Sequence, residues 1–505
     1  MVARVHTVAF QGIETLPIEV EVQLSNGLPS FMIVGLPDKA VAESKERVRS
    51  ALNSMGLALP PKRITVNLSP ADVIKEGSHF DLPIALGLLS AMEAIAPDAV
   101  IEYLMLGELG LDGAIKPVAG VLPAAMRAYG EGLGMICPVA QGGEAAYAGE
   151  FEIIAAPSLL SLLNHVAGKQ VLASPNPIFH KENKPLPDLA DIKGQEAAKR
   201  AMEIAAAGGH NLLMTGPPGS GKSMLAARLP SILPPLEPSE ALQLSLIHSV
   251  AGLLKDGHIC TERPYRDPHH STSVPALVGG GSKGKPGEIS LAHHGVLFLD
   301  ELPEFSRQAL ESMRQPIETG TVNIARVNAH VSYPANFQLV AAMNPCKCGY
   351  LSDPERACTR APKCALDYQA RISGPLLDRI DIRIDVPALS ASDLNLPPPS
   401  EGSQAVAARV TNARKIQRSR FEAMGVDLFC NAQAQGKALE AITKLDEESR
   451  KLMHTASEKL RLSARGYHRV LRVARTIADL QAMPAIQRHH IAEALGFRDV
   501  PYKHG

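Results

Sequence analysis

The chain has 505 residues, of which 45% are apolar and 20% are charged, and its formal net charge is −1. The length predicts two to four domains, and the near-zero charge excludes a bulk field that would draw the whole molecule to nucleic acid. The first residues lack the apolar segment and cleavage site of a signal peptide, so we expect a cytoplasmic protein that does not involve a membrane.

Residues 1–168 predict a compact α/β domain. Residues 18–24 alternate apolar and polar side chains as a half-buried strand does, residues 38–55 carry aliphatic side chains at helical spacing, and residues 63–68 indicate a second strand. A polar, proline-bearing stretch follows, and it predicts a linker over residues 169–189.

Residues 190–392 predict a P-loop ATPase domain. A short apolar strand at residues 211–215 leads directly into a phosphate-binding loop, which consists of Gly216, Pro217, Pro218, Gly219, Ser220, Gly221, Lys222 and Ser223. The glycines let backbone N–H groups turn toward phosphate oxygens, Lys222 supplies charge to the β- and γ-phosphates, and Ser223 supplies a magnesium ligand. The pattern predicts bound ATP and Mg²⁺. The alternative, a glycine-rich turn that binds nothing, is disfavoured because a strand precedes the loop and a helix follows it.

Two later strands end in polar residues suited to ATP hydrolysis. The apolar run at residues 295–299 ends in Asp300 and Glu301, about 80 residues after the loop. Asp300 would hold Mg²⁺ through water, and Glu301 would orient and deprotonate the attacking water. The strand at residues 338–343 ends at Asn344, which would help to place that water near the γ-phosphate. In isolation each of these signals is weak, because acidic turns and asparagine caps are common.

These motifs, in this order, resemble the AAA+ ATPases, and their details resemble the magnesium-chelatase-like branch, which includes bacterial competence proteins. The most specific stretches are residues 191–196, 206–211, 263–270, 287–293 and 376–381. The resemblance implies an α/β protein with three parts. They are an N-terminal domain with the ribosomal-S5/Lon-like fold, an α/β/α AAA+ domain with a helix-2 insertion, and a C-terminal helical domain over residues 393–505.

The resemblance also assigns roles that spacing alone does not. Asn344 is implied to be sensor 1, and Arg379 the arginine finger that reaches the γ-phosphate of a neighbouring subunit. The alternative for Arg379 is a structural ion pair with Asp378 or Asp381. Arg465 is implied to be sensor 2, with Arg469 as the alternative, because arginines recur along one helical face in this segment.

The N-terminal domain departs from the Lon-like proteases that it resembles. Where they carry the nucleophilic serine, this chain has His79, with Ser78 one position away, and where they carry the lysine base it has Leu122. A serine without a base is a weak nucleophile, so we expect no peptidase activity.

Four cysteines cluster within 19 residues, at positions 346, 348, 358 and 364. Four thiolates at tetrahedral distance would bind structural Zn²⁺. The spacing is not that of paired C-x₂-C motifs, and unligated or redox-sensing thiols remain the alternative. Two histidine pairs, residues 269–270 and 293–294, are further candidate ligands, but structural or nucleotide-proximal roles are the favoured interpretation.

Two segments carry basic residues suited to a phosphate backbone. A long insertion, roughly residues 242–293, contains Lys283 and Lys285, and residues 321–333 predict a hairpin with Arg326 near its tip. In the related branch such elements point into the pore of a hexamer, although as residues they are equally compatible with ordinary solubilising charges.

The resemblance therefore implies a hexameric ring motor that acts on branched or single-stranded DNA, in branch migration during recombination and natural transformation. The alternative is a chelatase-type ATPase subunit that remodels a protein partner for metal insertion. A relic of an ATP-dependent protease is a third interpretation.

Overall fold

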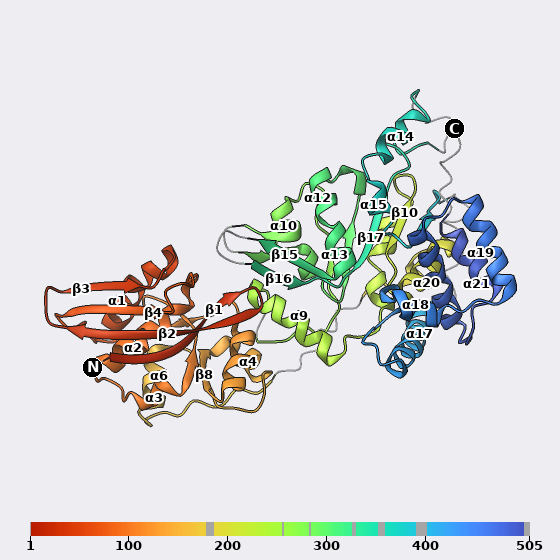
Figure 1. Ribbon diagram of the computed structural model, residues 1–505. Helices are drawn as coiled ribbons and strands as arrows, with labels where there is room; N and C mark the ends of the chain where they lie inside the picture. Colours follow the sequence, from red (N-terminus) through yellow and green to blue (C-terminus); the bar gives the residue numbers. More distant parts are fainter. Residues whose placement is uncertain are drawn as a thin grey trace.

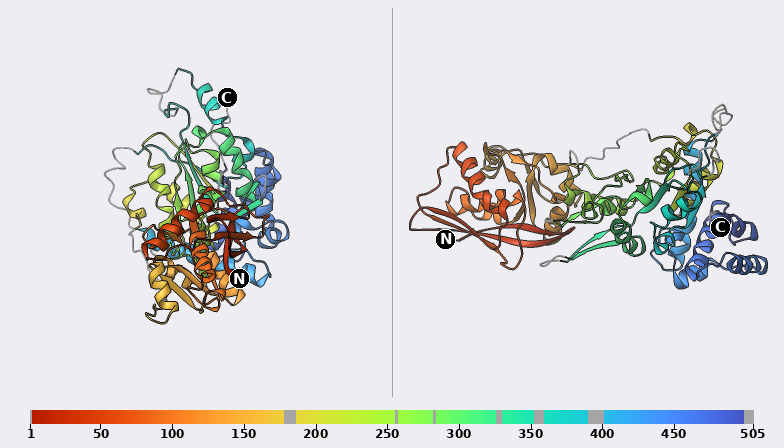
Figure 2. Two further views of the ribbon diagram at one scale, coloured as in Figure 1. Left: turned by 90° about the vertical axis from the view of Figure 1, so that its left-hand side faces the viewer. Right: turned by 90° about the horizontal axis from the view of Figure 1, so that it is seen from above.

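The computed structural model describes residues 2–177, 186–254, 257–281, 284–325, 330–351, 359–389 and 401–498. Three parts follow one another along the chain and along the long dimension of the molecule (Figures 1 and 2). Parts of the predicted boundary segments, residues 178–185 and 390–400, lie outside the described residues. The boundaries themselves therefore stay predictions. The mixed α/β class, with a parallel sheet and a helical C-terminal region, is confirmed.

The N-terminal part is built on a seven-stranded sheet in the order β3-β4-β2-β1-β5-β8-β9. Its first two strands form a long antiparallel hairpin in which Val5 faces Val20, and both side chains are fully buried. Alternating burial of residues 18–22 in β2 matches the predicted period-two pattern, and β4 alternates in the same way. The strands of this sheet are β1 (Val2–Gln11), β2 (Glu14–Ser25), β3 (Ser30–Val34), β4 (Arg63–Ser69), β5 (Tyr103–Met105), β8 (Gly134–Pro138) and β9 (Ile153–Ala156). A separate two-stranded sheet consists of β6 (Glu108–Leu109) and β7 (Ile115–Lys116).

The helices of this part cover the sheet, and one of them is buried along its whole length except for its last residue. That helix, α2 (Asp81–Ala91), is almost entirely apolar, as a helix enclosed on all sides must be. Its one charged residue, Asp81, is paired with Arg47 at 2.6 Å. The remaining helices are α1 (Lys39–Ser54), η1 (Ser78–Phe80), α3 (Asp98–Ile101), α4 (Val121–Glu131), η2 (Val139–Gln141), α5 (Gly142–Ala146) and α6 (Leu159–Val166).

The central part is a five-stranded parallel sheet in the order β11-β14-β17-β10-β18. Its three inner strands are apolar without alternation, as expected for strands that are covered by helices on both faces. The strands are β11 (Tyr265–Arg266), β14 (Val296–Leu299), β17 (Gln338–Met343), β10 (Leu212–Thr215) and β18 (Ile382–Asp385). Parallel strands end at one edge of the sheet, and this edge brings the loops after β10, β14 and β17 together.

The predicted insertion, residues 242–293, contains one strand of the central sheet. Tyr265 and Arg266 form β11, which pairs with Val296 and Leu297 of β14. A strand of two residues has no detectable periodicity, so the sequence could not separate it from the insertion. The predicted insertion therefore consists of two segments, one on either side of β11.

The predicted hairpin at residues 321–333 is confirmed as β15 (Thr321–Ala325) and β16 (His330–Pro334), and Arg326 at its tip lies outside the described residues. Beside it lies a short ribbon of β12 (Gly279–Gly280) and β13 (Lys285–Pro286). The helices of the central part are η3 (Leu189–Asp191), α7 (Glu196–Gly208), α8 (Lys222–Ala226), η4 (Leu229–Ile232), α9 (Pro238–Ala251), α10 (Val274–Val278), α11 (Glu288–Leu291), η5 (Leu302–Glu304), α12 (Arg307–Ser312), α13 (Arg314–Thr319), α14 (Lys363–Gln369) and α15 (Gly374–Leu377).

The C-terminal part is helical and shares a hydrophobic core with one face of the central sheet. Ile204 and Leu212 of the central part belong to the same buried cluster as Val410 and Val470. Its helices are α17 (Ser403–Ala423), η6 (Asn431–Gln433), α18 (Gly436–Ile442), α19 (Glu447–Lys459), α20 (Ala464–Leu480) and α21 (Arg488–Gly496).

The N-terminal part docks on the central part where α4 packs against α9 (Figure 1). Ser249 near the end of α9 is the centre of this contact. Its hydroxyl lies 2.5 Å from Glu144 Oε1, and its carbonyl accepts the Gly120 N–H at 3.0 Å. Glu144 also accepts the Leu122 N–H at 3.0 Å, at the start of α4. Burial raises the pKa of Glu144, against the lowering effect of these hydrogen bonds. The joint between the two parts is therefore a buried polar network.

Candidate functional site

The phosphate-binding loop joins β10 to α8, as the sequence predicts. Gly219 and Gly221 have φ of 76° and 89°, a conformation that side chains rarely adopt. Gly216 lies against the chain after β18, because a Cβ there would fall 2.1 Å from the Val386 carbonyl oxygen. Local sequence thus dictates the loop's shape at three glycines.

Lys222 points back into this loop. Its Nζ donates to the carbonyls of Gly216 and Pro217, both at 2.8 Å, and approaches Asn344 Oδ1 at 3.3 Å. Burial lowers the pKa of Lys222, and the nearby charges of Asp300 and Glu301 oppose that shift. Lys222 and Asn344, which are far apart in the sequence, therefore meet at the edge of the sheet.

Ser223 and the acidic pair complete this edge. Ser223 Oγ donates to Asp300 Oδ2 at 2.7 Å, so the two predicted magnesium ligands are in direct hydrogen-bond contact. Glu301 has a φ of 51°, and its N–H is held by Asp300 Oδ1 at 2.9 Å. This left-handed turn, which is strained for glutamate, follows the end of β14. Hydroxyl and carboxylate oxygens are the donors that Mg²⁺ prefers, so the residues present fit this ion.

A histidine stands beside Glu301. His270 Nδ1 lies 3.5 Å from Glu301 Oε2, and its ring stacks on that of His269 with centroids 4.0 Å apart. The nucleotide-proximal interpretation thus fits the first histidine pair. In the second pair, His294 Nδ1 lies 3.4 Å from Glu240 Oε1. Burial lowers the pKa of His293 to about 2 and that of His294 to about 4, as befits structural residues.

The two candidate arginines meet on a carboxylate that the sequence did not single out. Arg379 donates to Glu318 Oε2 at 2.5 Å and to the Arg314 carbonyl at 3.0 Å, and it is almost fully buried. Arg465 Nη2 lies 3.5 Å from the other oxygen of Glu318, and its side chain is 61% exposed. Among the described residues, neither guanidinium bonds to the phosphate-binding loop or to the acidic pair. Glu318 is on α13, 61 residues before Arg379, so no local pattern could have revealed the contact.

The ion pair of Arg379 is with Glu318, not with the predicted Asp378 or Asp381. Asp381 pairs instead with Arg469, at 2.8 Å, and accepts the Asn211 N–H at 3.1 Å. Burial opposes ionisation of Asp381, but the hydrogen bond from His210 and the Arg469 charge hold its pKa below the usual range. Arg469 is thus held in a mostly buried ion pair with Asp381, whereas Arg465 is exposed beside Arg379.

Three of the four clustered cysteines come together. The thiols of Cys346, Cys348 and Cys364 all lie within 4.8 Å of one another, and Cys346 Sγ is 3.1 Å from Cys348 Sγ. Cys358 lies outside the described residues. The donor set fits a thiolate metal site, because sulfur atoms on a tetrahedral Zn²⁺ are separated by about 3.8 Å.

The predicted DNA-facing elements adjoin one another. Tyr333 of β16 donates its hydroxyl to the Gly284 carbonyl at 2.8 Å, so the hairpin and the β12–β13 ribbon are bonded together. Lys285 is exposed on this surface, and Lys283 lies outside the described residues.

In the N-terminal part, the predicted peptidase positions are occupied by other contacts. The Ser78 hydroxyl donates to Glu108, and His79 is buried with Nε2 2.9 Å from the Val8 carbonyl oxygen. Leu122 is fully buried. The expected lack of peptidase activity stays a prediction.

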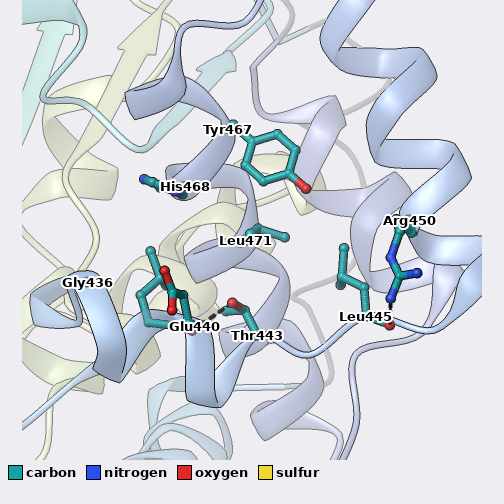
Figure 3. Close-up of a pocket in the computed structure, with 9 residues that line it drawn as sticks. Gly436, Glu440, Thr443, Leu445, Arg450, Tyr467, His468 and Leu471 are labelled. Carbon is teal, nitrogen blue, oxygen red and sulfur yellow. Dashed lines mark hydrogen bonds between the residues drawn. The ribbon is translucent and has the colours of Figure 1, made fainter.

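A pocket lies in the helical part, between α18, α19 and α20 (Figure 3). It encloses about 330 Å³ and is lined by Leu439, Leu471 and Tyr467, with Arg450 and Glu440 among its polar residues. Its lining includes none of the site residues described above.

In the described ranges, no helix combines the length and apolar character required to cross a membrane.

Comparison with known families finds matches along most of the chain. "Magnesium chelatase, subunit ChlI" matches residues 188–394, "Subunit ChlI of Mg-chelatase" matches residues 20–141, and "Magnesium chelatase, subunit ChlI C-terminal" matches residues 400–498.

Individual relatives match over similar lengths. The competence protein ComM of Haemophilus influenzae is 43% identical over 98% of this chain and 97% of its own length. The uncharacterized protein YifB of Escherichia coli is 42% identical over 98% of this chain and 97% of its own. The magnesium-chelatase 38 kDa subunit of Rhodobacter capsulatus is 24% identical over 61% of this chain and 86% of its own.

Proposed function

This chain belongs to the family of ComM and magnesium-chelatase-like AAA+ proteins, and on that premise we propose that it is an ATP-driven ring motor that acts on DNA. The observation that carries the proposal is the full-length match to a competence protein together with an intact nucleotide site. By analogy with that relative, the substrate would be branched or single-stranded DNA during recombination in natural transformation.

The chemistry follows from the converging side chains. Lys222 would leave the loop carbonyls for the β- and γ-phosphates, because phosphate oxygens neutralise its charge better than carbonyls do. Ser223 and Asp300 would hold Mg²⁺, and the ion would offset the charge of the phosphate oxygens. Glu301 would accept the proton of the attacking water, and Asn344 would position that water.

Among the described residues, neither Arg379 nor Arg465 bonds to the phosphate-binding loop of its own chain, and we expect a second subunit to supply the positive group for the γ-phosphate. Arg379 is held away from the loop of its own chain by Glu318. We therefore place it, with Arg465 beside it, against the nucleotide of a neighbouring subunit in a ring, for which six subunits is the expectation. An arginine in that position stabilises charge on the transferring phosphoryl group.

DNA contact is proposed for the surface that carries Lys285, where the ribbon and hairpin adjoin. The chain's net charge of −1 gives no bulk attraction, so this local surface must provide it. Binding to phosphates is independent of sequence and weakens steeply with salt.

The test is the ATPase rate with and without a four-way DNA junction, at about 50 and 200 mM salt. We expect strong stimulation at low salt that falls at high salt, and no ATPase activity in Lys222→Ala. A Lys285→Glu variant should retain its basal rate and lose stimulation. An unstimulated rate and no junction binding at the lower salt would overturn the proposal.

A chelatase-type subunit is the second candidate, because three ChlI descriptions match the chain. It would use ATP to remodel a protein partner for metal insertion. DNA would then leave the ATPase rate unchanged at both salt concentrations, so the same assay separates the two candidates.

We also propose a structural Zn²⁺ on Cys346, Cys348 and Cys364. By sequence, Cys358 is the fourth candidate ligand, outside the described residues. Metal analysis of protein purified without chelators should find about one zinc per chain. Less than half an equivalent would contradict the site.

A further inference from the structure

The backbone at Gly349 touches the phosphate-binding loop. A Cβ on Gly349 would lie 2.5 Å from Cδ and 2.7 Å from Cγ of Pro218, and the residue has a φ of +84°. Both the close approach and the left-handed backbone exclude a larger residue. Pro218 stands in the middle of the loop that wraps phosphate, so a segment outside the motif fixes the position of one wall of the loop.

That segment, residues 346–349, is here called the cysteine knuckle. It follows Asn344 and Pro345 directly at the end of β17, and the Gly349 N–H closes it by donating to the Cys346 carbonyl at 3.0 Å. Gln369, at the end of α14, donates to the Pro345 carbonyl at 3.0 Å. The residue before the knuckle is therefore hydrogen-bonded to Gln369, and Gly349 at the end of the knuckle contacts Pro218.

The three thiols connect the knuckle with α14. Cys346 and Cys348 lie on the knuckle, and Cys364 lies on α14, with all three sulfurs within 4.8 Å. A metal held by these thiolates would cross-link the knuckle to α14. Neutral thiols would be weak hydrogen-bonding groups and would hold the same elements only loosely.

We propose that a thiolate-bound metal at Cys346, Cys348 and Cys364 holds the cysteine knuckle against Pro218, and that this contact sets the shape in which the phosphate-binding loop takes ATP. The inference rests on the zinc site proposed above. Gly349 and Pro218 then act as positioning residues, and loss of the metal lowers nucleotide affinity without removing any residue that touches phosphate.

The contact is tested by a pair of substitutions in the full chain. Gly349→Ala should retain its zinc and bind a fluorescent ATP analogue at least tenfold more weakly, with KM raised more than kcat is lowered. Pro218→Ala removes the ring atoms that the new methyl group would strike. The double variant should therefore bind the analogue more tightly than Gly349→Ala does.

Gly425→Ala is the matched control. Gly425 has a φ of +67°, but a Cβ there would meet no atom of the described residues within 4 Å. It carries the same backbone strain without a contact, and its affinity should equal that of the unaltered protein.

The metal is tested separately by chelation. Stripping the unaltered protein should weaken nucleotide binding, and adding back Zn²⁺ alone should restore it. An unchanged affinity in Gly349→Ala, or a loss that Pro218→Ala does not relieve, overturns the bracing contact and leaves the zinc site standing. Purified protein without zinc, or affinity unaffected by chelation, overturns the role of the metal and leaves the contact to be judged by the substitutions.

Discussion

At the scale of single residues, the proposed roles assign binding and hydrolysis of ATP to different side chains. Lys222 and Ser223 belong to the loop, whereas Glu301 stands apart in a strained turn with His270 beside it. A residue that only accepts a proton contributes to the transition state and little to binding.

Glu301→Gln should therefore bind ATP with affinity close to that of the unaltered protein and hydrolyse it about 10²- to 10⁴-fold more slowly. Single-turnover hydrolysis and equilibrium binding measure the two quantities. Lys222→Ala, which should lose binding as well, is the control. A hydrolysis rate within a few fold of the original would remove Glu301 from the role of general base.

A second residue-scale consequence concerns pH. His79 is buried, and burial lowers its pKa to about 4, while its hydrogen bond to the Val8 carbonyl and the Asp38 charge act in the opposite direction. Between pH 6.5 and 4 the unfolded chain binds a proton that the folded one excludes, so the stability of this domain falls as pH falls through that window. From pH 7 to pH 5 the loss should be about 2 kcal/mol.

Hydrogen exchange of peptides from β1 and β2 at both pH values measures this loss. His79→Gln has an amide that can still donate to Val8 and does not titrate, so the difference in protection between the two proteins should shrink toward pH 5. Identical pH dependence in the two proteins would show that His79 does not cause it.

The site residues that could be predicted are those whose signal is local. Lys222, Asp300 and Asn344 each follow a buried strand, and parallel strands bring such positions to one edge. The structure indeed brings these three together. Glu318 could not be predicted, because its role depends on the packing of α13 beside two distant arginines. The contact of Gly349 with Pro218 could not be predicted either, because it also depends on packing between segments that are distant in the sequence.

At the scale of elements, strong periodicity was informative and short elements were not. The hairpin β15–β16 and the alternating strand β2 are where the patterns placed them. β11 was missed, because two residues carry no period. The joint between α4 and α9 was also invisible, since a lone glutamate and a lone serine in a sequence do not indicate a mutual contact.

Glu144 and Ser249 should act as a coupled pair at this joint. Each single alanine substitution should lower the exchange protection of residues 118–124. The double variant should lose less than the sum, with a coupling of about 0.5–3 kcal/mol. Ser245→Ala is the control, because Ser245 lies on the same helix and bonds to Ala241 and Cys260 instead. Strictly additive losses would mean that the pair does not hold the two parts together.

At the scale of the whole molecule, the proposed ring makes each site the product of two subunits. Arg379→Ala and Lys222→Ala should both be inactive alone, for different reasons: one lacks the arginine supplied to a neighbour, the other cannot bind ATP. In a mixture, a Lys222→Ala subunit can offer its intact Arg379 to an Arg379→Ala subunit that binds ATP.

Mixing the two inactive proteins should therefore restore part of the ATPase rate, with a maximum at intermediate ratios. Mixing Arg379→Ala with a chain that combines Lys222→Ala and Arg379→Ala controls for non-specific effects of added protein, because that chain has no arginine to offer. A mixture as inactive as its components would indicate that Arg379 serves only the ion pair with Glu318.

The helix α9 connects two regions that are otherwise distant. It begins six residues after η4, which follows the loop helix α8, and its Glu240 is clamped by Arg263 at 2.7 Å. Its other end is bonded into the N-terminal part through Ser249. Fourteen residues of α-helix form a stiff rod about 21 Å long. Because both ends of this helix are bonded, a tilt of its start would be carried to the N-terminal part.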